Sequence, residues 1–257
     1  MQYLNTFEFT TTMSIKSPVG TFPFHIKSYD ADFQGRLNME ALFHYLQEVA
    51  WENARNNNFG YEFMQQENAI WALSKVRLEM LSTLRWNEQI AIKTWPRGGE
   101  GFFAFRDYEV LQQDKVVGKA TSHWLIVDIH NKRPRKVDNY FFANETYCQD
   151  KALPEAKLEK LHLNGDLPQI DTRKVHMSDI DVNQHVNNAT YVKWCIDAIP
   201  TVLLKERPVS AIEINYLAEL TGGETIGIFH KQQADKHQII IKNLETKRPV
   251  CTAQIEV

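Results

Sequence analysis

The chain has 257 residues, enough for one large domain or for two modules of ordinary size. Hydrophobic residues make up 43% of it and aromatic residues 11%, which is sufficient for a buried core. A formal net charge of −3 argues against a dedicated nucleic-acid-binding protein, which is usually clearly basic.

Three cysteines, Cys148, Cys195 and Cys251, stand far apart in the sequence. Their odd number argues against a disulfide framework, and no Cys/His spacing suggests zinc, so we expect neither a metal nor another cofactor. Because free cysteines are typical of reducing compartments, we expect a cytoplasmic protein. The first residues have no signal-peptide pattern, and no apolar stretch approaches the ~18 residues of a membrane-spanning helix. These features predict a soluble protein without a membrane partner.

The first half of the chain predicts a strand, a helix and then a meander of strands. Hydrophobic residues alternate between Thr21 and Tyr29, and they recur at helical spacing over residues 39–55, with Asn38 as the N-cap. Strand-like runs follow at Ile70–Met80, Gln89–Trp95, Phe102–Leu111 and Val116–Ile129. We expect a Pro/Gly loop at Pro96–Gly101 and a tight hairpin at Gln112–Lys115.

The second half repeats this order after a charged, proline-containing linker at 132–167. The repeat begins with a short strand, Ile170–His176, and a polar segment, Ser178–Asn188. A helix is predicted at Ala189–Ile199, ending before Pro200. The strands expected after it are Ser210–Leu217, Thr225–Gln233, Gln238–Leu244 and Val250–Val257.

The two polar segments before the helices align with each other. D-A-D-F-Q-G-R-L-N from Asp30 matches D-I-D-V-N-Q-H-V-N from Asp179. The alignment pairs Asp32 with Asp181, Gln34 with Asn183, Arg36 with His185, and Asn38 with Asn187. Further on, Val76–Glu79 falls against Ile212–Asn215, and Glu88 falls against Glu224. Since the histidine occurs in the second copy, we expect the first copy to serve structure or substrate binding.

A helix on one face of an antiparallel sheet, occurring twice, defines an α+β protein with a tandem hotdog architecture. Side-by-side pairing of the two sheets would join edges that otherwise stay open. We expect an N-terminal module at 1–131, the linker at 132–167 and a C-terminal module at 168–257. A homodimer is a further expectation.

The segment Asp179–Asn188 concentrates residue types that carry chemistry. If it is extended, Asp181, Asn183 and His185 share one side, and an imidazole exchanges protons near neutral pH. The following helix start offers free backbone N–H groups to a developing oxyanion. The alternative is a polar loop in which an asparagine caps the helix.

The string D-V-N-Q-H-V-N-N-A-T-Y, Asp181–Tyr191, resembles the signature of the plant and bacterial acyl-[acyl carrier protein] thioesterases. The resemblance continues in the first half, through Leu46-Gln47-Glu48, Trp71-Ala72-Leu73 and Thr94-Trp95-Pro96, and covers most of the chain. It implies a double hotdog fold and hydrolysis of fatty acyl thioesters. It also implies an acyl carrier protein as partner.

The resemblance implies a catalytic set of Asp181, Asn183, His185 and Glu219. In many plant members a cysteine follows the glutamate, but this chain has Leu220 there, so no thiol nucleophile is expected. We therefore expect Glu219 to activate water, Asn183 to hold the carbonyl oxygen, and His185 to polarise water or protonate the thiolate. Asp181 would orient Asn183 or His185. Glu219 considered alone could equally be a solvated acid at a strand end.

A fatty acyl chain needs an apolar tunnel, which we expect Leu42, Leu46, Val49 and Ala50 of the first helix to line, although such residues can also be plain core. An acidic carrier protein would dock on basic residues, and the densest run is 132–136, K-R-P-R-K, with Arg173, Lys174 and Lys193 near the motif. Such runs are also common on solvated surfaces. The competing functions are an acyl-coenzyme A thioesterase, a hotdog hydratase and a non-catalytic acyl-binding module.

Overall fold

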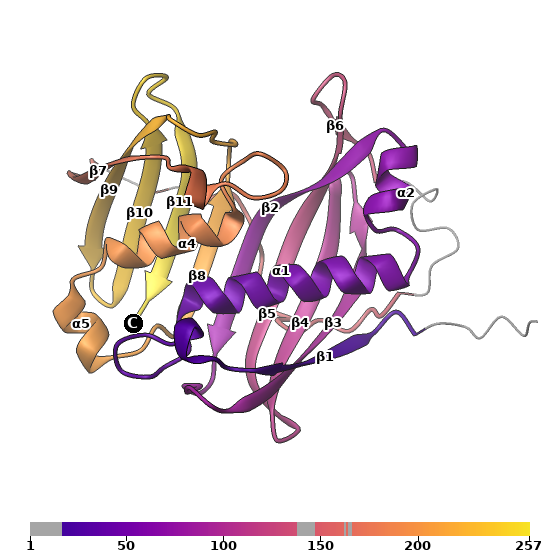
Figure 1. Ribbon diagram of the computed structural model, residues 1–257, viewed down its shortest axis with the longest axis horizontal. Helices are drawn as coiled ribbons and strands as arrows, with labels where there is room; N and C mark the ends of the chain where they lie inside the picture. The colour runs from indigo at the N-terminus through magenta and orange to yellow at the C-terminus, as the bar shows by residue number, and fades with distance from the viewer. Residues whose placement is uncertain (1–16, 138–146, 162, 164–165) are drawn as a thin grey trace, which may run out of the picture.

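The computed structural model describes residues 17–137, 147–161, 163 and 166–257. It contains one antiparallel sheet of eleven strands with helices across one face (Figure 1). The first half supplies β1 (Gly20–His25), β2 (Ala69–Met80), β3 (Gln89–Glu100), β4 (Phe103–Gln112), β5 (Lys115–Asp128) and β6 (Pro134–Arg135). The second half supplies β7 (Gln169–Lys174), β8 (Ala211–Tyr216), β9 (Thr225–Gln233), β10 (Lys236–Asn243) and β11 (Pro249–Glu256).

The sheet has the same strand order on both sides of a central join. The order is β1-β3-β4-β5-β2-β8-β11-β10-β9-β7, with β6 beside β5, so β2 and β8 connect two equivalent halves. Arg77 of β2 lies opposite Glu213 of β8, and its Nη1 donates to Glu213 Oε2 at 3.0 Å. These two residues occupy equivalent positions in the repeat, so the join is self-complementary, as in a two-fold dimer. The expected side-by-side pairing of the two sheets is confirmed.

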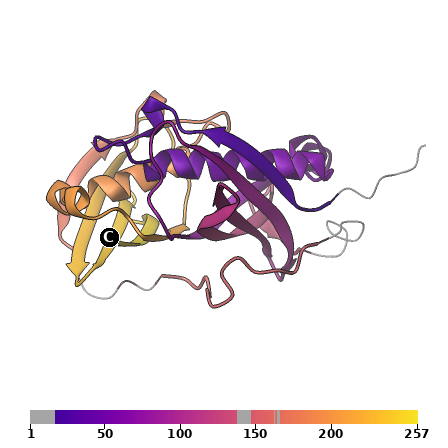
Figure 2. The ribbon, with the colours of Figure 1, turned by 90° about the horizontal axis from the view of Figure 1, so that it is seen from below.

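Helices α1 (Met39–Asn56) and α4 (Asn188–Asp197) lie on the same face of the sheet (Figures 1 and 2). Each begins at an asparagine N-cap, as the sequence predicts for α1. Asn38 Oδ1 accepts from the Ala41 amide at 2.7 Å, and Asn187 Oδ1 accepts from the Ala189 amide at 2.9 Å. The apolar sides of both helices are buried in one continuous core against the sheet. The predicted α+β class is confirmed.

Two short helices, α2 (Tyr61–Gln66) and α5 (Thr201–Glu206), were not predicted because six residues are too few for a clear period. The expected loop at Pro96–Gly101 is wrong, since β3 continues to Glu100 with an irregular register between Pro96 and Gly98. The pairing of β1 with β3 begins at Gly20 opposite Thr94. Within the described residues, Pro96 therefore lies where this edge of β3 has no partner strand, and its missing N–H removes no hydrogen bond between strands. The hairpin at Gln112–Lys115 is confirmed, with positive φ at both central residues.

The segment 147–161 crosses the face of the sheet opposite the helices (Figure 2). The Ala152 amide donates to Asp107 Oδ2 at 3.0 Å, Lys75 Nζ donates to the Leu158 carbonyl at 3.0 Å, and the Leu161 amide donates to Asn215 Oδ1 at 2.8 Å. The linker segment therefore spans strands of both halves. The division at 131 and 168 stays a prediction.

Burial changes the pKa of ionisable side chains in the first half. Arg106 is 5% exposed on the helix side of β4, where Nη1 donates to Asn53 Oδ1 at 2.7 Å and to Thr94 Oγ1 at 3.1 Å. Burial lowers the pKa of Arg106, as expected for a cation removed from water. Burial, together with the charges of Lys75 and Arg97, also lowers the pKa of His123 to about 4.

Candidate active site

The second-copy loop, residues 179–187, is a compact turn held by Asp181. Asp181 Oδ1 accepts from the Asn183 amide at 2.8 Å, and the Asp181 amide donates to the His185 carbonyl at 2.9 Å. Gln184 adopts a positive φ of 65°, which lets the chain turn sharply between Asn183 and His185. Asp181 thus fixes the backbone that carries the two neighbouring polar side chains.

Glu219 lies beside His185, although 33 residues separate them in the sequence. His185 Nε2 and Glu219 Oε2 are 3.2 Å apart. The Val186 amide donates to the Leu220 carbonyl at 2.9 Å, which ties the loop to the segment that carries Glu219. The His185 side chain is 32% exposed and that of Glu219 is 59% exposed, so water reaches the pair. A carboxylate and an imidazole in contact can pass a proton between them.

Asn183 and Asp181 lie in the same loop but make different contacts. The Asn183 side chain is exposed, and within the described residues it makes no hydrogen bond, so its carboxamide is free for a ligand. Asp181 Oδ2 accepts from the Asn187 side chain at 3.5 Å. Asp181 therefore contacts the Asn183 backbone and the N-cap of α4; its predicted role in orienting a catalytic side chain stays a prediction.

The first-copy loop, residues 30–38, repeats this backbone without the acid-base pair. The Asp32 amide donates to the Arg36 carbonyl at 2.7 Å, and Asp32 Oδ1 accepts from the Gln34 amide at 2.8 Å, as in the second copy. The Leu37 amide donates to the Leu84 carbonyl at 2.9 Å, so Thr83 stands where the second copy has Glu219. The repeat read from the sequence is confirmed, and its first copy lacks a base.

A cleft of about 700 Å³ lies over the first-copy loop. The charged side chains that line it are already paired. Asp32 binds Arg36 at 2.7 Å, and Arg173 binds Asp197 at 2.8 Å. Arg36 also donates to the Leu204 carbonyl at 2.6 Å. Although this space is large, its charged groups are occupied by one another and do not form an acid-base pair.

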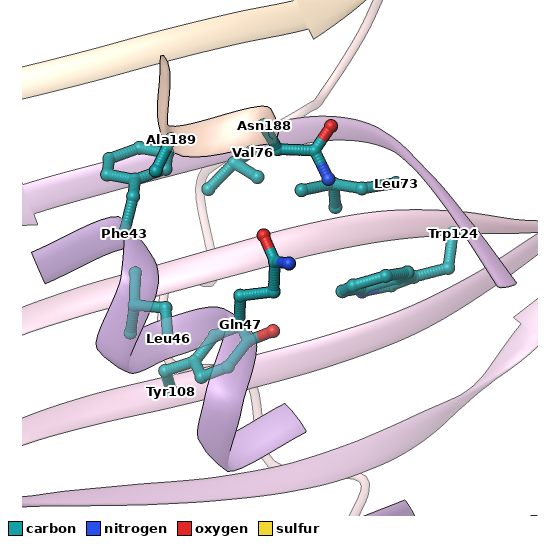
Figure 3. Close-up of a pocket in the computed structure, with 9 residues that line it drawn as sticks. All are labelled: Phe43, Leu46, Gln47, Leu73, Val76, Tyr108, Trp124, Asn188 and Ala189. Carbon is teal, nitrogen blue, oxygen red and sulfur yellow. The ribbon is translucent and has the colours of Figure 1, made fainter. Parts of the chain in front are cut away.

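A narrower pocket lies between α1, the sheet and the first turn of α4, next to the second-copy loop (Figure 3). Its lining residues are Phe43, Leu46, Gln47, Leu73, Val76, Tyr108, Trp124, Asn188 and Ala189. The free volume is about 10 Å³, which is room for about one water, so an acyl chain enters only when lining side chains move.

Of the four residues predicted to line an acyl tunnel, Leu46 borders this pocket. Leu42, Val49 and Ala50 are buried in the core around α1. Their role in binding an acyl chain stays a prediction. Gln47 and Asn188 were not among the predicted site residues. Gln47 lies within a helical pattern, which gives no sign of the pocket that tertiary packing forms around it, and Asn188 ends the polar segment 179–188, where an asparagine can also serve as a helix cap.

Within the described residues, none of the three cysteines forms a hydrogen bond with His185 or Glu219. Cys195 is buried in α4 and Cys251 in β11, and burial raises the pKa of the Cys251 thiol well above its ordinary value. Cys148 lies in the linker segment, where partial burial also raises the pKa of its thiol. A thiol held in its protonated form is a poor nucleophile.

The basic run at 132–136 is only partly available to a partner. Arg135 binds Asp128 Oδ2 at 2.6 Å and donates to the carbonyls of Glu67 and Asn68 at 2.7 and 3.2 Å. The Arg135 guanidinium lowers the pKa of Asp128 to about 2. Lys132, Arg133 and Lys136 are exposed, whereas Arg173 near the motif is paired with two aspartates. Arg135 therefore has a structural role.

In the described ranges, 17–137, 147–161, 163 and 166–257, no three or more His, Cys, Asp or Glu residues are grouped to hold a metal ion. The same residues contain no helix that is long and apolar enough to span a bilayer.

The two helices, the joined sheets and the repeated loops define a tandem hotdog protein with one intact polar site. Solved structures share this fold. An acyl-ACP thioesterase from Bacteroides thetaiotaomicron matches with a TM-score of 0.86 at 24% identity, over 95% of this chain and 99% of that one. The 12:0-ACP thioesterase from Umbellularia californica matches with a TM-score of 0.84 at 18% identity, over 95% and 98%.

Residues 21–144 match the model of the acyl-ACP thioesterase N-terminal domain, and residues 166–255 match that of the C-terminal domain. The chain therefore belongs to the acyl-ACP thioesterase family. It is 27% identical to the chloroplastic oleoyl-acyl carrier protein thioesterase 2 of Arabidopsis thaliana, over 76% of this chain and 58% of that protein. It is 23% identical to the oleoyl-acyl carrier protein thioesterase of Coriandrum sativum, over 87% and 65%. The chain thus spans less than two thirds of each relative.

Proposed function

We propose that this protein hydrolyses fatty acyl-[acyl carrier protein] to a free fatty acid and the carrier thiol. The observation that carries the proposal is the 3.2 Å contact between His185 Nε2 and Glu219 Oε2, both open to water, in a chain of the acyl-ACP thioesterase family. The relatives named above are thioesterases that act on acyl carrier protein substrates, which supports the same substrate class.

In the proposed reaction, water is the nucleophile. Glu219 accepts a proton from water as the water oxygen bonds to the thioester carbon, and the carbonyl oxygen takes up the negative charge. The Asn183 carboxamide and a backbone N–H at the start of α4 donate to this oxyanion. Glu219 then passes its proton to His185 across their contact. When the intermediate collapses and the carbon–sulfur bond breaks, His185 protonates the thiolate. Asp181 holds the turn on which Asn183 and His185 sit.

The N-terminal module, residues 1–131, would bind the acyl chain, and the C-terminal module, residues 168–257, would supply the chemistry. The pocket beside α4 leads from Asn188 and Ala189 toward Leu46 of α1, which gives the chain a direction of entry. We propose that the chain then reaches Leu42, Val49 and Ala50 as core side chains shift. Their burial in a continuous apolar core supports this proposal.

The partner would be an acidic acyl carrier protein, docked on exposed cations that include Lys132, Arg133 and Lys136. We keep a reducing compartment such as the cytoplasm as the proposed location, because all three cysteines are free. A homodimer stays a proposal. The plant relatives are chloroplastic proteins, as their names state.

The proposal is tested by offering the protein acyl carrier thioesters and acyl-coenzyme A thioesters of the same chain side by side, and measuring released fatty acid. We expect a higher kcat/KM with the carrier substrate and loss of turnover in His185→Ala. Preference for coenzyme A would favour the acyl-coenzyme A thioesterase instead. Binding of both thioesters without release of acid, in the folded wild-type protein, would favour a non-catalytic acyl-binding module.

A further inference from the structure

The pocket beside α4 has four polar side chains in its wall, and two of them have no hydrogen-bond partner among the residues that the structure describes. Trp124 Nε1 donates to Ser122 Oγ at 2.8 Å, and Ser122 Oγ lies 3.4 Å from the Tyr108 hydroxyl, so these two lining residues are satisfied. The side chains of Gln47 and Asn188 make no hydrogen bond to any residue that the structure describes. Figure 3 shows both carboxamides extending into the pocket, one from α1 and one from α4.

The two halves of the repeat differ at these positions. Gln47 is the ninth residue of α1, and the ninth residue of α4 is Ile196. Asn188 is the first residue of α4, and the first residue of α1 is Met39. Ile196 and Met39 both line the cleft over the first-copy loop, as Gln47 and Asn188 line the pocket beside the second-copy loop. The fold therefore accepts apolar side chains at equivalent positions, and packing does not demand amides.

The two amides border a pocket that begins at Asn188, the residue directly after the second-copy loop that carries His185. The pocket beside the loop of His185 is lined by the amides Gln47 and Asn188. The cleft over the loop of Arg36 is lined at the equivalent positions by the apolar residues Ile196 and Met39. A half-buried carboxamide without a partner is unfavourable unless water or a ligand satisfies it. A carboxamide offers one acceptor and two donors, which match a carbonyl oxygen and the N–H of a neighbouring amide.

We propose that Gln47 and Asn188 are substrate-positioning residues that hydrogen-bond the thioester end of the acyl chain, at its carbonyl and at the first amide of the carrier's pantetheine arm. This inference rests on the proposed function and deepens it. The working site is then shared: the acid-base groups come from the second half of the chain, and α1 of the first half supplies Gln47 to the pocket beside them. The second half alone forms an incomplete site.

The test replaces Gln47 by Met, which keeps the length of the side chain and removes its hydrogen-bonding atoms. The matched control is Ile196→Met, at the equivalent position in the other helix. The binding probe is dodecanoyl pantetheine with the thioester sulfur replaced by nitrogen, which is stable to hydrolysis, and its Kd is measured by calorimetry. Turnover of a dodecanoyl carrier thioester is measured in parallel, with the melting temperature of each variant.

We expect Gln47→Met to weaken binding of the probe by about 3- to 10-fold, the usual size of one lost hydrogen bond, and to lower kcat/KM by at least as much. Ile196→Met should change neither, and both variants should melt near the wild type. Asn188→Met should act like Gln47→Met and serves as the second variant if Gln47→Met fails to fold. Unchanged probe binding in folded Gln47→Met and Asn188→Met would overturn the inference.

Failure of the proposed function has a different signature. Wild-type protein that binds the probe but releases no fatty acid would contradict the thioesterase activity. Weaker binding of the probe in Gln47→Met would in that case still support Gln47 as a positioning residue. Wild-type protein that does not bind the probe would contradict both.

Discussion

Replacing Glu219 by Gln should lower turnover strongly and change the stability of the fold only slightly. The Gln side chain keeps the shape of Glu but cannot accept the proton of the attacking water, so we expect turnover to fall by about two to four orders of magnitude. That loss corresponds to about 2.7–5.4 kcal/mol of activation free energy. The His185–Glu219 contact is open to solvent, and an exposed ion pair contributes at most about 1 kcal/mol to folding. The melting temperature should therefore move by no more than about 4 °C.

The assay is release of free fatty acid at saturating acyl carrier thioester, with thermal unfolding of each variant. The control is a variant with Ala at Cys148, Cys195 and Cys251. Because Cys195 and Cys251 are buried, that variant should lose stability, about 1 kcal/mol per site, while its turnover stays near that of the wild type. A Glu219→Gln protein with near-normal turnover, beside a folded but inactive cysteine-free protein, would refute water activation by Glu219.

Three further perturbations test other parts of the structure. Lys132→Glu with Lys136→Glu should raise KM for the carrier thioester, more at low salt, and leave hydrolysis of a small acyl thioester unchanged; equal loss on both substrates would contradict docking there. His123 has a pKa of about 4 in the folded state, below its value of about 6.5 in the unfolded state. As the pH drops, the unfolded state therefore binds the proton first. The free energy of unfolding should fall between pH 6.5 and 4, by up to about 3 kcal/mol. Urea unfolding across that range should show a shallower decline in His123→Phe, and an identical decline would contradict this origin. Asn53→Leu should lower the free energy of unfolding by about 2–4 kcal/mol, because it leaves the buried cation of Arg106 without its closest partner; an unfolding midpoint equal to that of the wild type would contradict it.

Local patterns predict most of the fold because local chemistry decides those elements. Asn38 caps α1 as its position suggests, and β9 has the predicted bounds, Thr225–Gln233. The loop prediction at Pro96 was wrong because a strand tolerates proline only where its neighbour does not pair with it. β1 begins at Gly20, opposite Thr94, and the sequence of β3 carries no information about where β1 begins. A proline in a strand edge without a partner looks the same in sequence as a proline in a loop.

The site was only partly predictable from residue chemistry. The turn of Asp181, Asn183 and His185 is local and is recognisable from spacing. Glu219 reaches His185 through the return of the chain beside α4, so residue patterns alone could not choose it over other strand-end acids, and the family resemblance did. Gln47 lies in a helix with a regular apolar stripe, and its exposure to a pocket depends on a helix that begins 141 residues later.

The register of β2 against β8 has a consequence for how the two sites could become different. Arg77 faces Glu213 at equivalent positions, so the join has the geometry of a symmetric dimer interface. In a dimer of identical chains, both sites have the same sequence. Any substitution would occur in both of them, and a histidine lost from one site would also be lost from the other. Here the axis relates two segments of one chain, which can change independently. Covalent fusion thus permits symmetry breaking: Arg36 can bind Asp32 and a carbonyl of α5 at one site, while His185 stays beside Glu219 at the other.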